Sequence, residues 1–62
     1  SRCLTVNKDT PLSEVVNEFT TDRYSIVSVI GAKDKLEHTL SETEVVQGLL
    51  DKGLKVKIRD LI

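Results

Sequence analysis

The period of apolar and polar positions changes several times along the chain, and each change marks a predicted element. Between residues 11 and 20 the apolar residues recur at the spacing of one helix face: Leu12, Val15, Val16 and Phe19. Thr10 is a good residue to cap the start of this helix, and Pro11 suits its first position because proline has no amide to leave unpaired. We therefore predict a helix over 11–20, with Phe19 in the core.

Four other segments have the composition or the alternation of strands. Residues 4–6 are β-prone, and residues 24–30 are rich in β-branched side chains and apolar on both faces, which is typical of a central strand. Residues 36–40 alternate, and the polar turn at 31–35 is short enough to join them to 24–30 as an antiparallel hairpin. Residues 54–59 alternate as a half-buried strand, whose solvated face carries Lys55, Lys57 and Arg59.

The stretch around Ser41 is the most informative part of the chain. Ser41 and Glu44 have the spacing of a capping box, and Val45, Val46, Leu49 and Leu50 then give one apolar side to a helix over about 42–51. Gly53 is well placed to end this helix. Gly48 inside it costs about 1 kcal/mol relative to alanine, and either a close contact or a neutral surface position explains it. A strand end beside a helix N-terminus is a common ligand site, although capping alone explains Ser41 and Glu44.

The predicted order is β-α-β-β-α-β in a single domain over residues 1–62. Two helices with one apolar stripe each need one sheet face to cover, so the fold class is a two-layer α+β module, a small sheet with both helices on one face. A chain of 62 residues has little core, and such modules often gain stability by pairing. We therefore expect a homodimer in which the apolar sides of Val45, Val46, Leu49 and Leu50 are shared between the core and the partner.

The composition excludes several classes of function. Nine basic and ten acidic residues give a net charge of -1, so no one-signed field attracts nucleic acid or an anionic membrane, and no apolar run is long enough to enter a bilayer. One cysteine, Cys3, fits a reducing compartment, and we expect a cytoplasmic module or the cytosolic part of a membrane protein. The first residue is Ser1, so we expect a segment of a longer protein.

The same composition argues against an enzyme. Cys3 and His38 are too few for the ligands of a typical zinc site. No nucleophile-base pair, metal cluster or phosphate loop is visible, and Glu42 and Glu44 lie two apart on a helix, where side chains do not face each other. We therefore expect neither a catalytic site nor a metal.

Two segments together resemble the CBS domain, the small regulatory module named after cystathionine β-synthase. Residues 5–16 are similar to the family's short strand and Asp-Thr-Pro-Leu-like helix start, and residues 40–46 are similar to its strand, Thr/Ser-x-x-Asp motif and apolar helix. Residues 24–30 match its central strand, and residues 55–62 look like its closing Val-x-Asp-apolar stretch. The resemblance covers nearly the whole chain and rests on the order and spacing of these four segments.

The resemblance implies a ligand-sensing function. CBS domains usually pack in pairs, and clefts between the two units bind adenosine-containing ligands such as AMP, ATP or S-adenosylmethionine. Carried over by position, Ser41 and Glu44 would hold the ribose, and the backbone around Ser25, Ile26 and Val27 would face the base. Thr5 would lie at the edge of the cleft. Such a module would control a parent protein, whose other domains would be further partners.

Three departures from the family favour a second hypothesis. Glu44 stands where the family prefers aspartate, Ser28 where it often has proline, and His38 where it often has glycine. These residues favour an assembly module that dimerises or docks on its parent and binds no small ligand. A third hypothesis is a ferredoxin-like domain of the ACT type, which binds amino acids and has the same β-α-β-β-α-β order, although the usual Gly-rich ligand loop is missing.

Overall fold

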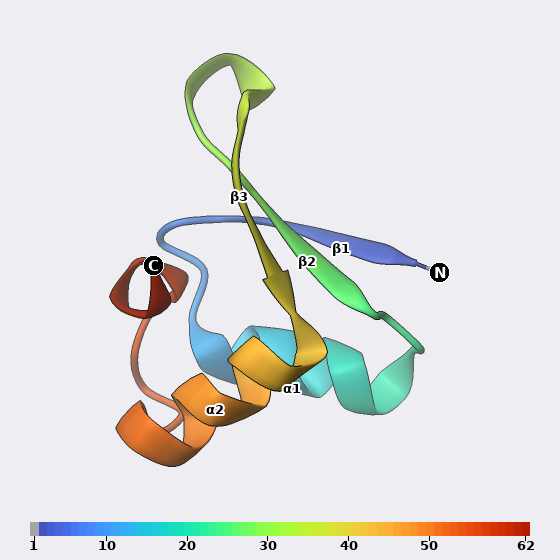
Figure 1. Cartoon of the computed structure of the whole chain (residues 1–62), viewed down its shortest axis with the longest axis vertical. Helices are drawn as coiled ribbons and strands as arrows, with labels where there is room; N and C mark the ends of the chain where they lie inside the picture. Colours follow the sequence, from blue (N-terminus) through green and yellow to red (C-terminus); the bar gives the residue numbers. More distant parts are fainter. Residues whose placement is uncertain (1) are drawn as a thin grey trace.

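The computed structural model describes residues 2–62 as a three-stranded sheet with two α-helices (Figure 1). In chain order the elements are β1 (Cys3–Asn7), α1 (Leu12–Thr21), β2 (Ile26–Ile30), the 3-10 helix η1 (Ala32–Asp34), β3 (Leu36–Ser41), α2 (Glu42–Lys52) and the 3-10 helix η2 (Ile58–Leu61). The first three predicted strands and both predicted helices are confirmed, with bounds that differ by one or two residues.

The strand that is apolar on both faces lies in the centre of the sheet, as predicted. The strand order is β1-β2-β3, with β1 parallel to β2 and β3 antiparallel to it. Helix α1 makes the crossover between the two parallel strands, and the turn at η1 closes the β2–β3 hairpin (Figure 1). This register sets Ile26 opposite Cys3 on one side and opposite Ser41 on the other.

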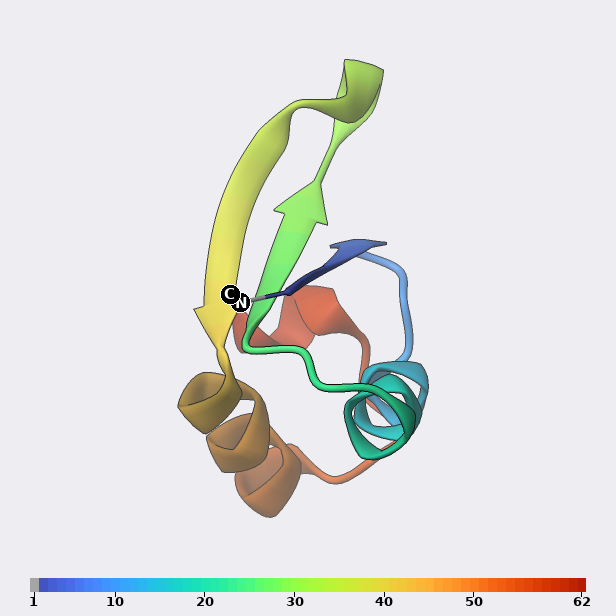
Figure 2. The same ribbon diagram turned by 90° about the vertical axis from the view of Figure 1, so that its right-hand side faces the viewer.

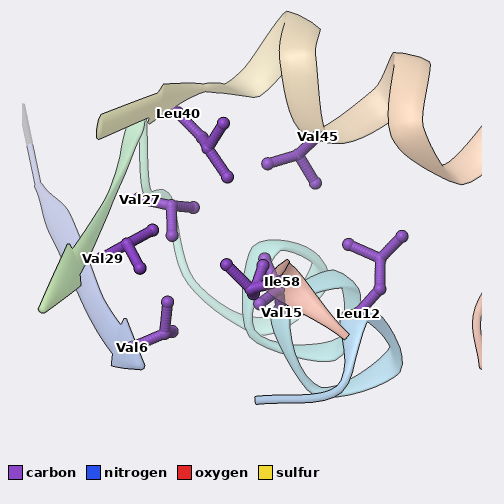
Figure 3. Packing of buried hydrophobic residues seen from close by; sticks show 8 residues of the cluster. All are labelled: Val6, Leu12, Val15, Val27, Val29, Leu40, Val45 and Ile58. Atoms are coloured by element: carbon purple, nitrogen blue, oxygen red, sulfur yellow. The ribbon is translucent and has the colours of Figure 1, made fainter. Parts of the chain in front are cut away.

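Both helices pack on the same face of the sheet, which confirms the two-layer α+β fold class (Figure 2). Buried side chains from all five elements and from the C-terminal segment meet in one cluster (Figure 3): Val6, Leu12, Val15, Val27, Val29, Leu40, Val45 and Ile58. Because side chains alternate along a strand, the residues between the buried ones point to the opposite face. No helix of residues 2–62 covers that face, which we call the open face (Figure 2).

The predicted fourth strand at residues 54–59 is wrong. This segment runs along the start of α1, where it makes one isolated bridge, between Pro11 and Lys57, and then enters η2. The amides of Leu12 and Ser13 donate to the carbonyls of Val56 and Leu54, at 2.8 and 3.1 Å. The alternation predicted the burial of Ile58 correctly, but residues 54–56 form a turn beside a helix start, and Ile58 and Arg59 belong to η2.

These carbonyls also explain why Thr10 does not cap α1. The N-cap residue is Pro11, and no side chain caps the helix. The free amides of the first turn are satisfied by the C-terminal segment, so the helix needs no side-chain cap. The Thr10 hydroxyl instead accepts a bond from the amide of Asn7 at 3.2 Å and stabilises the turn after β1.

The predicted core position of Phe19 is also corrected. Leu12 and Val15 are fully buried, whereas Phe19 is half-buried at the edge of the core. Its ring stacks on Tyr24, with 6.3 Å between the ring centroids. The helix stripe is therefore on the predicted face, and its last member packs at the edge of the core and on an aromatic neighbour that precedes β2.

Gly48 makes a close contact, which settles the alternative left open by the sequence. It is buried, and a Cβ atom at this position would overlap the Cδ2 atom of Leu61. The missing side chain lets η2 pack directly on α2. The C-terminal segment is thus tied to both helices.

Candidate functional site

The capping box predicted at Ser41 and Glu44 is present. Ser41 ends β3 and caps α2, and its hydroxyl oxygen accepts a bond from the Glu44 amide at 3.2 Å. The Glu44 Oε1 atom accepts bonds from the Ser41 amide and hydroxyl at 3.0 and 3.1 Å. The Glu44 carboxylate takes part in the capping box through Oε1, and its Oε2 atom makes none of these hydrogen bonds. Both residues are exposed.

The β-sheet register brings most of the other predicted site residues to the same end of the sheet. Ile26 lies directly opposite Ser41, and Ser25 precedes it with its amide bonded to the carbonyl of Arg2 at 3.0 Å. We call the cluster of Ser25, Ile26, Ser41 and Glu44 the Ser41 edge. Sequence spacing alone could not show that Ile26 and Ser41 are neighbours.

The two remaining predicted residues lie nearer the sheet centre. Thr5 pairs with Ser28 and, by alternation with buried Val6, points to the open face. The Val27 side chain is in the core, so only its backbone is left to face a ligand, which is the role that the resemblance implied. Thr5, Ile26 and Ser41 therefore share the open face.

Neither of two hollows on residues 2–62 is lined by more than one residue of the Ser41 edge. Of the hollows found on residues 2–62, one of about 510 Å³ lies at the other end of β2, beside Ile30 and Gly31. Another, of about 220 Å³, lies between α2 and η2 and touches the edge only through Glu44. A ligand held at the Ser41 edge would need a second unit over the open face to enclose it.

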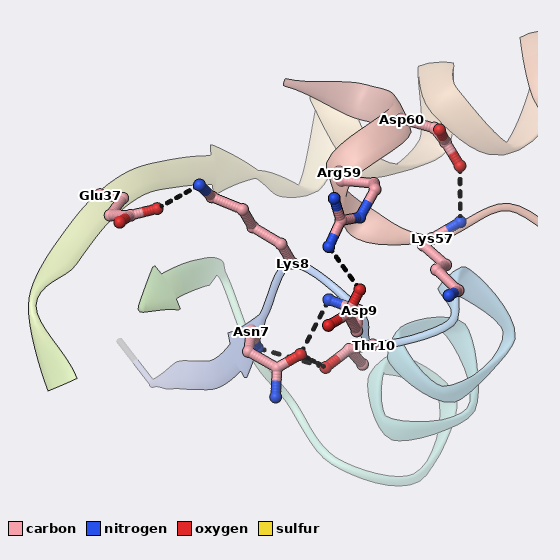
Figure 4. Close-up of polar contacts among 8 residues, drawn as sticks. All are labelled: Asn7, Lys8, Asp9, Thr10, Glu37, Lys57, Arg59 and Asp60. Carbon is pink, nitrogen blue, oxygen red and sulfur yellow. Dashed lines mark hydrogen bonds and ion pairs between the residues drawn. The ribbon is translucent and has the colours of Figure 1, made fainter. Parts of the chain in front are cut away.

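Figure 4 shows two of the ion pairs that the sequence analysis missed. Lys8 Nζ lies 2.8 Å from Glu37 Oε1, and Arg59 donates to Asp9 Oδ1. The hydrogen bond from Lys8 holds the pKa of Glu37 below its ordinary value, and the hydrogen bond and charge of Arg59 do the same for the pKa of Asp9. Both pairs join residues far apart in the chain, so no local spacing could reveal them.

The structure also bears on metals and membranes. Among residues 2–62, no group of three or more histidine, cysteine, aspartate or glutamate side chains could hold a metal ion. None of the helices in this described part is long and apolar enough to cross a bilayer. The exposed thiol of Cys3 lies on β1, opposite Ile26.

Comparison with known proteins gives the fold. Neither a protein-family model nor a curated protein sequence matches the chain. Among solved structures, OpuCA of Staphylococcus aureus is similar over 100% of this chain, with a TM-score of 0.74 and 18% sequence identity. The chain spans 51% of the length of that OpuCA chain. OpuCA is a CBS-domain protein, and the likeness shows that this chain has a CBS-like fold.

Proposed function

We propose that this chain is a regulatory CBS-like module that pairs with a second copy through the open face of its sheet. The pair holds an adenosine-containing ligand, AMP, ATP or S-adenosylmethionine, between the two units and thereby controls a parent protein. One observation carries this proposal: three of the residues expected at or near the ligand, Thr5, Ile26 and Ser41, lie together on the sheet face that no helix of residues 2–62 covers.

Two features support pairing through this face. Ile26 is 37% exposed there, although a β-branched apolar side chain is usually covered in a folded assembly. The OpuCA chain is about twice as long as this chain, which leaves room in it for a second unit of the same size. A second copy would supply such a unit here.

The chemistry of the Ser41 edge suits a ribose. A ribose presents two neighbouring hydroxyl donors, and an ionised carboxylate accepts through both oxygens. Because the capping box uses Glu44 Oε1, a ribose hydroxyl can donate to Oε2 without breaking the helix cap. The exposed part of Ile26 offers an apolar surface for the base.

A second candidate function is assembly without a small ligand. It is favoured because neither of two hollows on residues 2–62 is lined by more than one residue of the Ser41 edge. The ACT-type alternative needs a closing strand, and residues 54–59 do not form one.

Calorimetric titration of the wild type and of Glu44→Gln with AMP, ATP and S-adenosylmethionine tests the proposal. Glutamine can still accept the Ser41 amide, so the melting temperature should change little. Loss of a charge-assisted hydrogen bond should weaken ligand binding about ten- to a hundredfold. Glu42→Gln is the matched control, because Glu42 lies in the same helix turn outside the box, and it should bind like the wild type.

Two results would count against ligand sensing. If Glu44→Gln and Glu42→Gln bind the nucleotide equally well, the Glu44 carboxylate is not part of the ligand site. If the wild type is a dimer but gives no heat with millimolar AMP, ATP or S-adenosylmethionine, only the assembly function remains.

A further inference from the structure

The hollow of about 510 Å³ lies at the end of β2 opposite to the Ser41 edge and belongs to none of the functions considered above. Four segments build it: the loop after β1, the turn after β2, Glu37 of β3 and Arg59 of η2. We call it the Arg59 hollow. Its volume is in the range of small-molecule sites, and its walls come from parts of the chain that only the fold brings together.

Charges of both signs line the Arg59 hollow. The cations are Lys8 and Arg59, and the carboxylates are Asp9, Asp34 and Glu37. Each cation makes one ion pair, Lys8 with Glu37 and Arg59 with Asp9, as Figure 4 shows. An ammonium carries three N–H donors and a guanidinium five, so both cations keep donors that these pairs do not use.

The carboxylates are not fully matched by these cations. Within residues 2–62, the Asp34 carboxylate takes part in no side-chain hydrogen bond or ion pair, so the lining has one more negative than positive charge. A simple anion would meet three carboxylates here, and a simple amine would leave the spare donors of Lys8 and Arg59 unused. A ligand with both charges matches the lining best.

Gly31 keeps space for this arrangement. A Cβ atom at position 31 would overlap the Glu37 carboxylate, which occupies the place a side chain would take. Ile30 and Ala32, on either side of Gly31, add an apolar wall. The hollow therefore combines opposite charges with a short apolar surface.

We propose that the Arg59 hollow binds a small zwitterion of the α-amino acid class. The ligand ammonium lies between Asp34 and Glu37, and its carboxylate accepts from the spare donors of Arg59 and Lys8. Its side chain lies against Ile30 and Ala32. This site is independent of the nucleotide site, because Ile30 and Ile26 are at opposite ends of β2.

The test is calorimetric titration with glycine, L-alanine and L-leucine, followed by two analogues that each remove one charge of leucine. Isopentylamine lacks the carboxylate, and 4-methylpentanoate lacks the ammonium. We expect millimolar binding of at least one amino acid, and binding of leucine at least tenfold tighter than of either analogue. Amine binding equal to that of leucine would overturn the zwitterion, and so would the absence of heat with all three amino acids.

Asp34→Asn locates the site. Asparagine tolerates the positive φ of Asp34, so the turn should stay folded while the unpaired charge is lost. We expect it to weaken amino-acid binding at least tenfold without a fall in melting temperature. Glu14→Gln is the matched control, since Glu14 is an exposed carboxylate on α1 outside the hollow and should bind like the wild type. If Asp34→Asn and Glu14→Gln weaken amino-acid binding equally, or if neither weakens it, the assignment of the site is overturned.

Discussion

At the scale of single residues, the tip of the β2–β3 hairpin departs most from ordinary backbone geometry. Lys33 and Asp34 both have a φ of 59°, in the left-handed region that L-residues adopt at a cost. Aspartate offsets part of this cost through its short polar side chain, whereas lysine has no such means. Position 33 is therefore where the hairpin carries avoidable strain.

Lys33→Gly should stabilise the protein by up to about 1.5 kcal/mol. It removes a conformational cost of roughly 1–2 kcal/mol and adds about 0.5–1 kcal/mol of backbone entropy. The matched control is Lys35→Gly, where φ is -74° and the backbone is extended, and it should destabilise by about 0.5–1 kcal/mol. Urea unfolding of both variants measures the difference, and effects of the same sign would contradict it.

The two ion pairs predict how stability depends on pH. Asp9 and Glu37 have pKa values below their ordinary 3.8 and 4.5, because Arg59 and Lys8 stabilise the charged forms. The unfolded chain binds protons more readily, so this stabilisation is present above the ordinary values and is lost as pH falls through the folded pKa values. Both groups are exposed, so salt should screen the effect.

Glu37→Gln tests this dependence by thermal melts at several pH values. The variant should melt below the wild type at neutral pH and approach it as the pH falls through the lowered pKa of Glu37, where the wild-type carboxyl becomes protonated. Glu14→Gln, which breaks no ion pair of residues 2–62, is the control and should run parallel to the wild type. A constant gap between Glu37→Gln and the wild type at all pH values would show that the pair does not titrate as described.

Sequence could predict residue roles only where the partners are close along the chain. The Ser41–Glu44 box spans three residues, and Gly53 ends α2 with a φ of 84°, so standard helix-end patterns found both. Asp9 and Arg59 are 50 residues apart, and Arg59 was interpreted only as a solvated basic residue. The Arg59 hollow depends on such distant pairs, so no local pattern marks it.

At the scale of elements, the C-terminal segment holds the two helices together. Its carbonyls satisfy the first amides of α1, Ile58 is fully buried in the core, and Leu61 packs on Gly48 of α2. The alternation at residues 54–59 could not reveal this role. A buried Ile58 is compatible with a strand and also with a 3-10 helix packed on the core, so the pattern of apolar residues does not fix the backbone.

The contact between Gly48 and Leu61 can be tested by a double-mutant cycle. Gly48→Ala gains about 1 kcal/mol of helix propensity but overpacks against Leu61 at a cost of about 1–3 kcal/mol, so it should destabilise the wild type slightly. With Leu61→Ala the overlap is removed, and Gly48→Ala should then stabilise by about 1 kcal/mol. Urea unfolding of the four proteins measures the change of sign. The same effect in both backgrounds would contradict the contact.

At the scale of the whole molecule, exposed apolar side chains lie on several surfaces of residues 2–62, and two of these surfaces bear on pairing. One is the open face of the sheet, with Ile26 at 37% exposure, and the other is the outer side of α2, where Val46 and Leu50 are 46% and 75% exposed. The overall α+β layering could be predicted because each helix has one apolar stripe. The surface that meets a partner could not be predicted, because amphipathic patterns do not distinguish a core from an interface.

The proposed ligand cleft requires pairing through the open face, and paired substitutions separate the two surfaces. Ile26→Lys puts a charge on the open face, and Leu50→Lys puts one on the outer side of α2. Both side chains are exposed, so neither variant should unfold the monomer. We expect sedimentation equilibrium to show a micromolar dimer for the wild type and Leu50→Lys, and a monomer for Ile26→Lys.

The Cys3 thiol lies opposite Ile26, so dimer formation should also slow its alkylation in the wild type. Because the proposed function encloses the ligand between two units, Ile26→Lys should lose AMP binding together with the dimer. A dimer that survives Ile26→Lys but not Leu50→Lys would place the interface on α2 and remove the second wall from the Ser41 edge.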